Sequence, residues 1–174
     1  MNTANPYTRL ARLAIETYVK NGRLIIVPAN LPAALTSRQA GVFVSLHLPN
    51  GELRGCIGTI FPTRPSIAEE IIANAVAAAT QDPRFDPVEK KELTNLEISV
   101  DILSKPKTIS DSKLINPQKF GLIVTAGDGR SGLLLPDIPG VDTAGQQLSI
   151  CRRKGGIGPD EPVTLQIFTV HRHG

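Results

Sequence analysis

The dipeptide Asn50-Gly51 separates two runs of strand-type residues, and this arrangement constrains the fold more than any other feature of the sequence. In the first run, residues 42–48, apolar side chains alternate with others, and residues 53–59 form the second run. Asn-Gly between two such runs is the strongest short signal for a β-hairpin, because both residues accept the positive φ angles of a tight turn. The sequence therefore predicts an antiparallel pair.

A turn that is symmetric about Asn50-Gly51 predicts which side chains share a face of this hairpin. Leu46 then lies opposite Gly55 on an apolar face that belongs to the core, with Val44 opposite Ile57 and Val42 opposite Thr59. Directly opposed residues have Cβ atoms about 5 Å apart, so the other face becomes a small polar patch. The pairs predicted on that face are His47 with Arg54, Ser45 with Cys56, and Phe43 with Gly58.

The polar patch supports two functional interpretations and one structural interpretation. In the first, a cation near Cys56 favours its thiolate, which attacks an electrophile while His47 handles the proton. In the second, Arg54 and the amides of Gly55 and Gly58 hold a carboxylate or phosphate. In the structural interpretation, Cys56 is a buried small hydrophobe, since free cysteines are among the most buried residue types. The candidate catalytic residues are Cys56, His47 and Arg54, and Ser45, Gly55, Gly58 and Thr59 join Arg54 as candidate binding residues.

The segment "DPRFDP", residues 82–87, adds charged side chains to a turn between helices. Asp82 and Asp86 stand where a helix stop and an N-cap belong, which is the structural interpretation. Loops carry binding residues more often than their length suggests. Asp82, Arg84 and Phe85 are therefore candidate binding residues, with the last two expected to project towards the hairpin.

Three other motifs have stronger structural than functional interpretations. The glycines of "GDGRSG", residues 127–132, match G-x-G-x-x-G, but an extended run follows them where a dinucleotide site needs a helix. The cations of "CRRKGG", residues 151–156, suit the last turn of a helix that ends at glycine. No cysteine or histidine stands at a metal-ligand spacing, so we expect no metal site. The sequence leaves the cofactor unknown.

Hairpins mixed with helices, without regular βαβ alternation, predict an α+β fold with antiparallel sheets. Asn5 and Pro6 begin an amphipathic helix that ends at Asn21-Gly22, and Ser66 with Glu69 forms a capping box for a second helix. The other expected elements are a loop over residues 30–40, a short helix capped at Asp86, strands over 96–102, 120–125, 133–135 and 163–170, and a helix from Asp142 or Thr143 to Gly155.

The chain of 174 residues fits one domain, with 41% hydrophobic and 20% charged residues. Its longest apolar stretch, around residues 71–79, is far short of the roughly 20 residues that cross a bilayer, so we expect a cytoplasmic protein with two free cysteines. A net charge of +3 favours anionic partners. RNA is a weak alternative, because the absence of Trp leaves few platforms for base stacking.

The blocks "GVFVSL", "LRGCIGTI", "DPRFDPV", "LEISVDILSKP", "FGLIV" and "GLLLP" occur here in an order that resembles the AMMECR domain family, named for a human chromosomal region linked to Alport syndrome, midface hypoplasia and elliptocytosis. The likeness covers about residues 9–170. In "CRRKGGIGPDEP", Gly155 takes a position that the family fills with alanine, and an aromatic residue often found just afterwards is missing.

This resemblance implies a single α+β domain over residues 1–174, with two unequal lobes of antiparallel strands and helices around a cleft. It places the family signature on residues 53–58, with residues 82–85 as a second block. It implies no settled reaction, and it suggests Memo-like or radical-SAM proteins as partners. The residues themselves leave two functions open: an enzyme or enzyme component for a small anionic or carbonyl-bearing substrate, and a binding or adaptor module for a protein, nucleotide or RNA.

Overall fold

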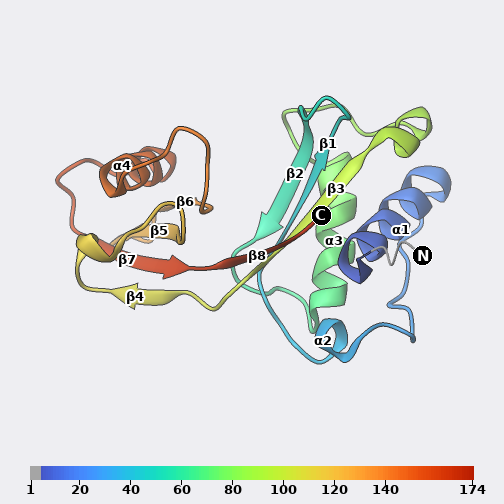
Figure 1. Cartoon of the computed structure of the whole chain (residues 1–174), viewed down its shortest axis with the longest axis horizontal. Coiled ribbons are helices and arrows are strands. Elements are labelled where there is room, and N and C mark those ends of the chain that lie inside the picture. Colours follow the sequence, from blue (N-terminus) through green and yellow to red (C-terminus); the bar gives the residue numbers. More distant parts are fainter. Residues whose placement is uncertain (1–4) are drawn as a thin grey trace. The chain divides into compact units, whose positions relative to one another are not determined.

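The computed structural model describes residues 5–174 as two compact units, each built around its own antiparallel sheet (Figure 1). Among the described residues, the first unit contains residues 5–103 together with His171–Gly174, and the second contains Ser104–Val170. The chain thus leaves the first unit after its third strand and returns to it at the end. The predicted α+β class with antiparallel sheets is confirmed.

The first unit packs helices against one face of a four-stranded sheet with the strand order β2-β1-β3-β8. The central strand β1 pairs with the hairpin partner β2 and, on its other side, with β3. The elements of this unit are α1 (Pro6–Asn21), α2 (Ala33–Thr36), β1 (Val42–His47), β2 (Leu53–Thr59), α3 (Ile67–Thr80), the 3₁₀ helix η1 (Lys90–Asn95), β3 (Glu97–Leu103) and β8 (Val170–His173).

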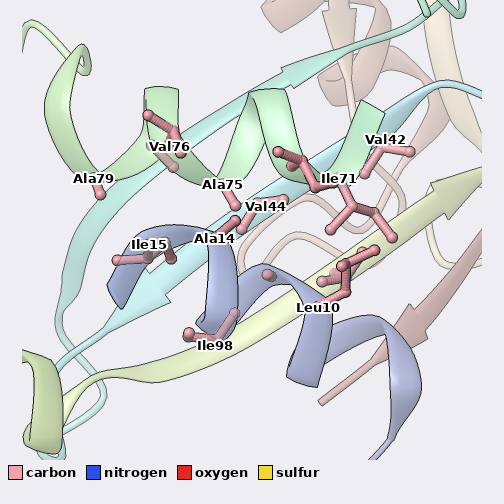
Figure 2. Close-up of a cluster of buried hydrophobic side chains, with 14 of the residues drawn as sticks. Leu10, Ala14, Ile15, Val42, Val44, Ile71, Ala75, Val76, Ala79 and Ile98 are labelled. Atoms are coloured by element: carbon pink, nitrogen blue, oxygen red, sulfur yellow. The ribbon is translucent and has the colours of Figure 1, made fainter. Parts of the chain in front are cut away.

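The core of the first unit lies between the helices and the covered face of the sheet. Val42, Val44 and Leu46 alternate along β1 and are each 0% exposed, as the period of two predicts. Figure 2 shows side chains of α1, α3, β1 and β3 pointing towards one another, among them Ala14 and Ala75. The alanines let the two helices and the sheet approach closely, so the covered face of the hairpin belongs to the core, as predicted.

Local capping chemistry sets the ends of the long helices. The Asn5 side chain accepts a hydrogen bond from the Tyr7 amide, and Gly22 ends α1 with a φ of 67°. Ser66 caps α3 as predicted. The predicted cap at Asp86 is wrong: Glu89 caps η1 through a reciprocal capping box with Glu92.

The second unit is a four-stranded sheet with the order β4-β7-β5-β6, against which one helix packs. Its elements are β4 (Lys107–Ile109), η2 (Ser112–Leu114), β5 (Gly121–Ala126), β6 (Ser131–Leu134), α4 (Ala144–Lys154) and β7 (Val163–Phe168). The predicted loop over residues 30–40 contains α2, and the predicted strand over residues 163–170 is divided between β7 and β8. Propensity alone did not indicate β4.

Two glycines of the motifs set aside above have a packing role. A Cβ on Gly132 would lie 1.9 Å from the carbonyl oxygen of Cys151, so β6 and the end of α4 meet backbone to backbone. Gly155 caps α4, and Cys151 is 0% exposed, where burial raises the pKa of its thiol to about 12. Arg152 donates to the carbonyls of Gly158 and Glu161, so this basic segment completes the fold of the second unit.

This contact predicts that Gly132→Ala destabilises the second unit by about 1–3 kcal/mol, the usual cost of overpacking a filled site. Gly127→Ala in the same β5–β6 turn is the matched control, because nothing lies within 4 Å of its added Cβ. Urea unfolding followed by circular dichroism, with amide exchange in β5, measures both variants. Equal stabilities for the two would contradict the close approach.

The environment of His173 in the C-terminal strand β8 predicts that the stability of the first unit depends on pH. The His173 ring stacks on Tyr7 with centroids 3.7 Å apart, and its Nδ1 accepts from Asn5 Nδ2 at 3.0 Å. Burial, and then the charge of His171, lowers the pKa of His173, although Asp101 opposes this shift. The unfolded chain therefore binds more protons in mild acid, and the first unit loses stability as the pH falls from about 6.5 through the lowered pKa.

The measurement is urea unfolding at about pH 7.5 and about pH 5. His173→Gln should flatten part of this dependence, because the substituted side chain does not titrate. If the unfolding free energy of His173→Gln changes with pH as much as that of wild type, the pH dependence comes from other groups.

Candidate functional site

The observed register of the hairpin confirms most of the predicted pairs. Ser45 lies opposite Cys56, and Phe43 lies opposite Gly58. The predicted pair of His47 with Arg54 is wrong, because the register shifts between Leu46 and His47 and brings His47 opposite Leu53. This bulge leaves Arg54 as an extra residue on β2, and a register drawn from a symmetric turn has no such residue. The structure therefore brings together the thiol and the hydroxyl of the predicted patch and moves the imidazole by one position.

The Cys56 thiol is free and half-buried on the face of the sheet opposite the helices. The Ser45 hydroxyl donates to Cys56 Sγ at 3.2 Å. This contact is what two opposed side chains on neighbouring strands provide.

The edge of the sheet beside Cys56 is closed by the "DPRFDP" segment. β2 is an edge strand, and the Cys56 amide donates to Asp82 Oδ2 at 2.8 Å. Arg84 Nη2 donates to the Cys56 carbonyl at 3.4 Å. Side-chain groups thus satisfy the amide and the carbonyl that this edge residue would otherwise leave without a partner. The predicted projection of this loop towards the hairpin is present.

Asp82 holds this closure together. Its carboxylate is only 4% exposed, and it accepts from the Cys56 amide, from the Arg84 amide at 3.1 Å, and from the Arg84 guanidinium through Nε at 2.9 Å and Nη2 at 2.7 Å. These donors, with the Arg84 side chain first, hold the pKa of Asp82 well below its usual range although burial opposes the shift. The carboxylate therefore stays ionised and orients Arg84.

The Arg54 guanidinium is directed to an acid rather than to the thiol. Its Nε and Nη2 donate to the two Glu92 oxygens at 2.8 and 3.1 Å, and Nη1 donates to the Asp86 carbonyl at 3.0 Å. The Arg54 side chain is 14% exposed, and this pairing lowers the pKa of Glu92. Fork-to-fork pairing of this kind fixes both partners. Arg54 thus fastens η1 and the loop to β2.

The Phe85 ring lies near both arginines of the site. Its ring centroid is 6.0 Å from the Arg54 Cζ and 5.5 Å from the Arg84 Cζ, both within cation–π range. The Arg84 side chain remains 55% exposed despite its bonds to Asp82. Of the two guanidiniums, Arg84 is the one that solvent, and hence a ligand, can reach.

Gly55 and Thr59 lie on the covered face of the hairpin. A Cβ on Gly55 would lie 2.2 Å from the carbonyl oxygen of Ala78, so β2 approaches the backbone of α3 directly. The Thr59 hydroxyl donates to Glu70 at 2.7 Å and lies 3.3 Å from Asn74 Nδ2. These two predicted binding residues therefore support the packing of the hairpin on α3. Gly58 lies under the Phe43 ring, 2.2 Å from where its Cβ would be.

Sequence reasoning missed the acids that organise this region. Glu92 is separated from Arg54 by 38 positions, and no spacing in the sequence connects them. Glu70 is 1% exposed and accepts from Thr59, from both the hydroxyl and the amide of Thr63, and from the Arg64 amide. Its only visible signal was its place one residue after the Ser66–Glu69 capping box.

Two cavities lie away from the thiol. One of about 650 Å³ is bounded by α1 and residues 28–32, and one of about 480 Å³ lies beside α4 in the second unit. Within residues 5–174, no three His, Cys, Asp or Glu side chains gather as metal ligands. The same part of the chain has no helix with the length and apolar character that crossing a membrane requires.

The chain matches known proteins over nearly its whole length. The family model described as AMMECR1 matches residues 8–173. A protein of Thermotoga maritima is 49% identical over 97% of both chains. A Clostridium acetobutylicum protein, CA_C1420, is 44% identical over 97% of this chain but only 36% of its own length. The crystal structure of uncharacterized protein PH0010 from Pyrococcus horikoshii superimposes with a TM-score of 0.86 at 37% identity, covering 95% of this chain and 88% of that one.

The role of Asp82 predicts that Asp82→Asn costs about 1–3 kcal/mol, because buried donors lose a charged acceptor. Since the folded pKa of Asp82 is lowered, its contribution is present above about pH 4 and is lost as the pH falls towards the folded value. Asp86→Asn is the control, because Asp86 contributes only its carbonyl. Equal unfolding free energies for the two variants at neutral pH would contradict this assignment.

Proposed function

Because the chain belongs to the AMMECR1 family, whose relatives named above bear no functional name, we propose its function from the site itself: an enzyme or enzyme component in which Cys56 attacks a small anionic or carbonyl-bearing substrate. The observation that carries this proposal is the hydrogen bond from Ser45 to Cys56 Sγ at 3.2 Å on a half-buried, solvent-reachable thiol. The thiolate is the reactive form of cysteine.

Arg84 supplies the charge in this proposal. Its own pKa is raised, first by its hydrogen bond to Asp82, and its Nη2 lies 3.4 Å from the Cys56 carbonyl oxygen, so the guanidinium stands beside this residue. A guanidinium that is 55% exposed and held by Asp82 is suited to a substrate carboxylate. The anion-binding role predicted for Arg54 passes to Arg84, because Glu92 occupies Arg54.

The covalent step needs no group beyond the thiol, the substrate and water. The thiol first gives its proton to solvent. Cys56 sulfur then forms a bond to the carbonyl carbon, the electron pair of the C=O π bond moves to oxygen, and the oxygen takes a proton from solvent. A general base would accelerate the first transfer. His47 stays a prediction for that role: it lies opposite Leu53, and its ring has no hydrogen bond or ion pair within the described chain.

A non-catalytic binding or adaptor module is the second candidate, and the placement of Phe85 favours it. An aromatic ring near both Arg54 and Arg84 offers a planar surface beside an exposed cation, which suits an acidic segment, a nucleotide or RNA. In CA_C1420 the matching region is about a third of a longer chain, so this kind of domain can be joined to further chain, as an adaptor module would be. Memo-like and radical-SAM partners remain predictions from the family resemblance.

The proposal predicts that Ser45→Ala slows alkylation of Cys56 by iodoacetamide about five-fold at neutral pH, because one hydrogen bond to the thiolate is worth about 1 kcal/mol. Ser99→Ala is the matched control. Ser99 lies on β3 opposite Ser45, so Ser45 separates it from Cys56 on β2. Peptide mass spectrometry separates Cys56 from Cys151. Equal alkylation rates in Ser45→Ala and wild type would remove the support for an activated thiol.

Two other variants separate the two candidates once native mass spectrometry has identified a molecule that copurifies with the protein. The enzyme proposal expects Cys56→Ser to abolish turnover of that molecule. The binding module expects Cys56→Ser to keep its affinity and Arg84→Gln to lose it.

A further inference from the structure

The Arg84 guanidinium keeps N–H groups that no other group of the described chain accepts. Asp82 accepts from Nε at 2.9 Å and from Nη2 at 2.7 Å, and Nη2 also donates to the Cys56 carbonyl at 3.4 Å. Within residues 5–174, Nη1 makes no hydrogen bond. Each terminal nitrogen of a guanidinium carries a pair of N–H groups, so the pair on Nη1 remains for a ligand.

The backbone of Cys56 connects these donors to the thiol. Its amide and its carbonyl both point to the edge of β2, where Asp82 and Arg84 bind them. Cys56 and Ser45 therefore form a non-hydrogen-bonded pair of the hairpin, the kind in which opposed side chains come closer, and the contact of 3.2 Å between them agrees with this. The free donors thus belong to the group that contacts the Cys56 carbonyl, and the sulfur is the side chain of that same residue.

The surroundings of Arg84 limit where an anion can approach. Asp82 occupies the Nε side of the guanidinium with both of its oxygens and is 4% exposed. The Phe85 ring lies beside the cation, with its centroid 5.5 Å from Cζ. The nearby charges of Arg54 and Glu92 are paired with each other. An anion therefore reaches this cation at Nη1, from the exposed part of the side chain.

These positions set the spacing between the two groups of a substrate. A carboxylate at Nη1 and a carbon in reach of Sγ are both held beside a single residue of β2, and one strand residue spans about 3.3 Å. A carboxylate bonded directly to the attacked carbon is the shortest connection between them. Each further CH₂ group moves the carboxylate away and adds a rotatable bond whose freedom is lost on binding. The geometry therefore favours a compact substrate over an extended one.

We propose, resting on the thiol chemistry proposed above, that this site accepts substrates whose carboxylate is bonded directly to the carbon that Cys56 attacks; among carbonyl compounds these are the 2-oxo acids. Arg84 Nη1 holds the carboxylate, and Asp82 fixes the guanidinium. The thiol gives its proton to solvent, and the sulfur forms a bond to the carbonyl carbon. The electron pair of the C=O π bond moves to oxygen, which takes a proton from solvent, so the product is a 2-hydroxy acid bonded to sulfur.

Two alkylating reagents of similar size test this proposal on the wild-type chain. Iodoacetate carries a carboxylate on the attacked carbon, and iodoacetamide carries a neutral amide there; with both, sulfur bonds to the CH₂ carbon and iodide leaves. Peptide mass spectrometry gives the ratio of the iodoacetate rate to the iodoacetamide rate at Cys56. This ratio should be at least about ten-fold higher than for the free thiol N-acetylcysteine amide, because hydrogen bonds between charged groups have that effect.

Arg84→Gln should return the ratio to that of the free thiol, because the amide side chain carries no charge. Arg172→Gln is the matched control: Arg172 forms the same two-point pair with the buried Asp101 and is 61% exposed. It lies on β8, three strand spacings from β2, or about 14 Å, which exceeds the Debye length of about 8 Å. This variant should keep the wild-type ratio, and circular dichroism checks that both variants fold.

The length of the reagent tests the spacing without any variant. In wild type, 3-iodopropionate compared with 3-iodopropionamide should show a smaller preference for the carboxylate, because one more CH₂ group separates it from the attacked carbon. An equal or larger preference for the longer acid overturns the proposed spacing. A ratio for iodoacetate equal to that of the free thiol, or a preference that Arg84→Gln keeps, overturns the carboxylate site.

The failure of this inference and the failure of the enzyme proposal have different signatures. If the iodoacetate ratio equals that of the free thiol while Ser45→Ala still slows iodoacetamide, the enzyme proposal stands and this substrate class is wrong. Equal iodoacetamide rates in Ser45→Ala and wild type overturn the enzyme proposal, and this inference with it. A Cys56 that neither reagent alkylates also overturns both.

Discussion

The Asp82 carboxylate is the interaction on which the arrangement around Cys56 depends. It is buried, and it accepts from the amide of an edge strand and from both the amide and the guanidinium of Arg84. A buried carboxylate without such donors would cost free energy, so losing one of these hydrogen bonds weakens the reason for burying Asp82 and with it the others. Through this group the loop after α3 closes the edge of β2, and the backbone at Cys56 and the cation beside it are held by one side chain.

The two arginines near the thiol differ because each meets a different acid. Glu92 takes Arg54 through both oxygens and leaves it little exposed, so Arg54 fastens η1 to the hairpin. Asp82 takes Arg84 but leaves most of that side chain in solvent. Partial exposure is what recognition of an anion needs, because a fully paired and buried cation has no free donor for a ligand. The cation available to a substrate is therefore the one in the loop, not the one two residues before the cysteine.

Predictions from the sequence succeeded where the physical cause is local. The Asn5 and Ser66 caps set α1 and α3, and the alternation in β1 identified its covered face. They failed at details of local geometry and of contacts far along the chain. The bulge at Leu46/His47 moved His47 away from Arg54, and η1 begins at Lys90, not after a cap at Asp86, because Glu89 and Glu92 form a capping box. The sequence left a ligand and another backbone as alternatives beside Gly55, and the backbone of α3 takes that space.

The sequence alone determined the α+β class, the hairpin and the place where Cys56 and Ser45 meet. The alternation of side chains along a strand, the residues of the turn and the register that this turn sets all depend on neighbouring residues. Only the tertiary structure decided which acid each arginine binds, and that the backbone of α3 fills the space beside Gly55. Those outcomes depend on burial and on contacts between segments far apart in the chain, and the free energy of a charge or an apolar side chain depends on what surrounds it.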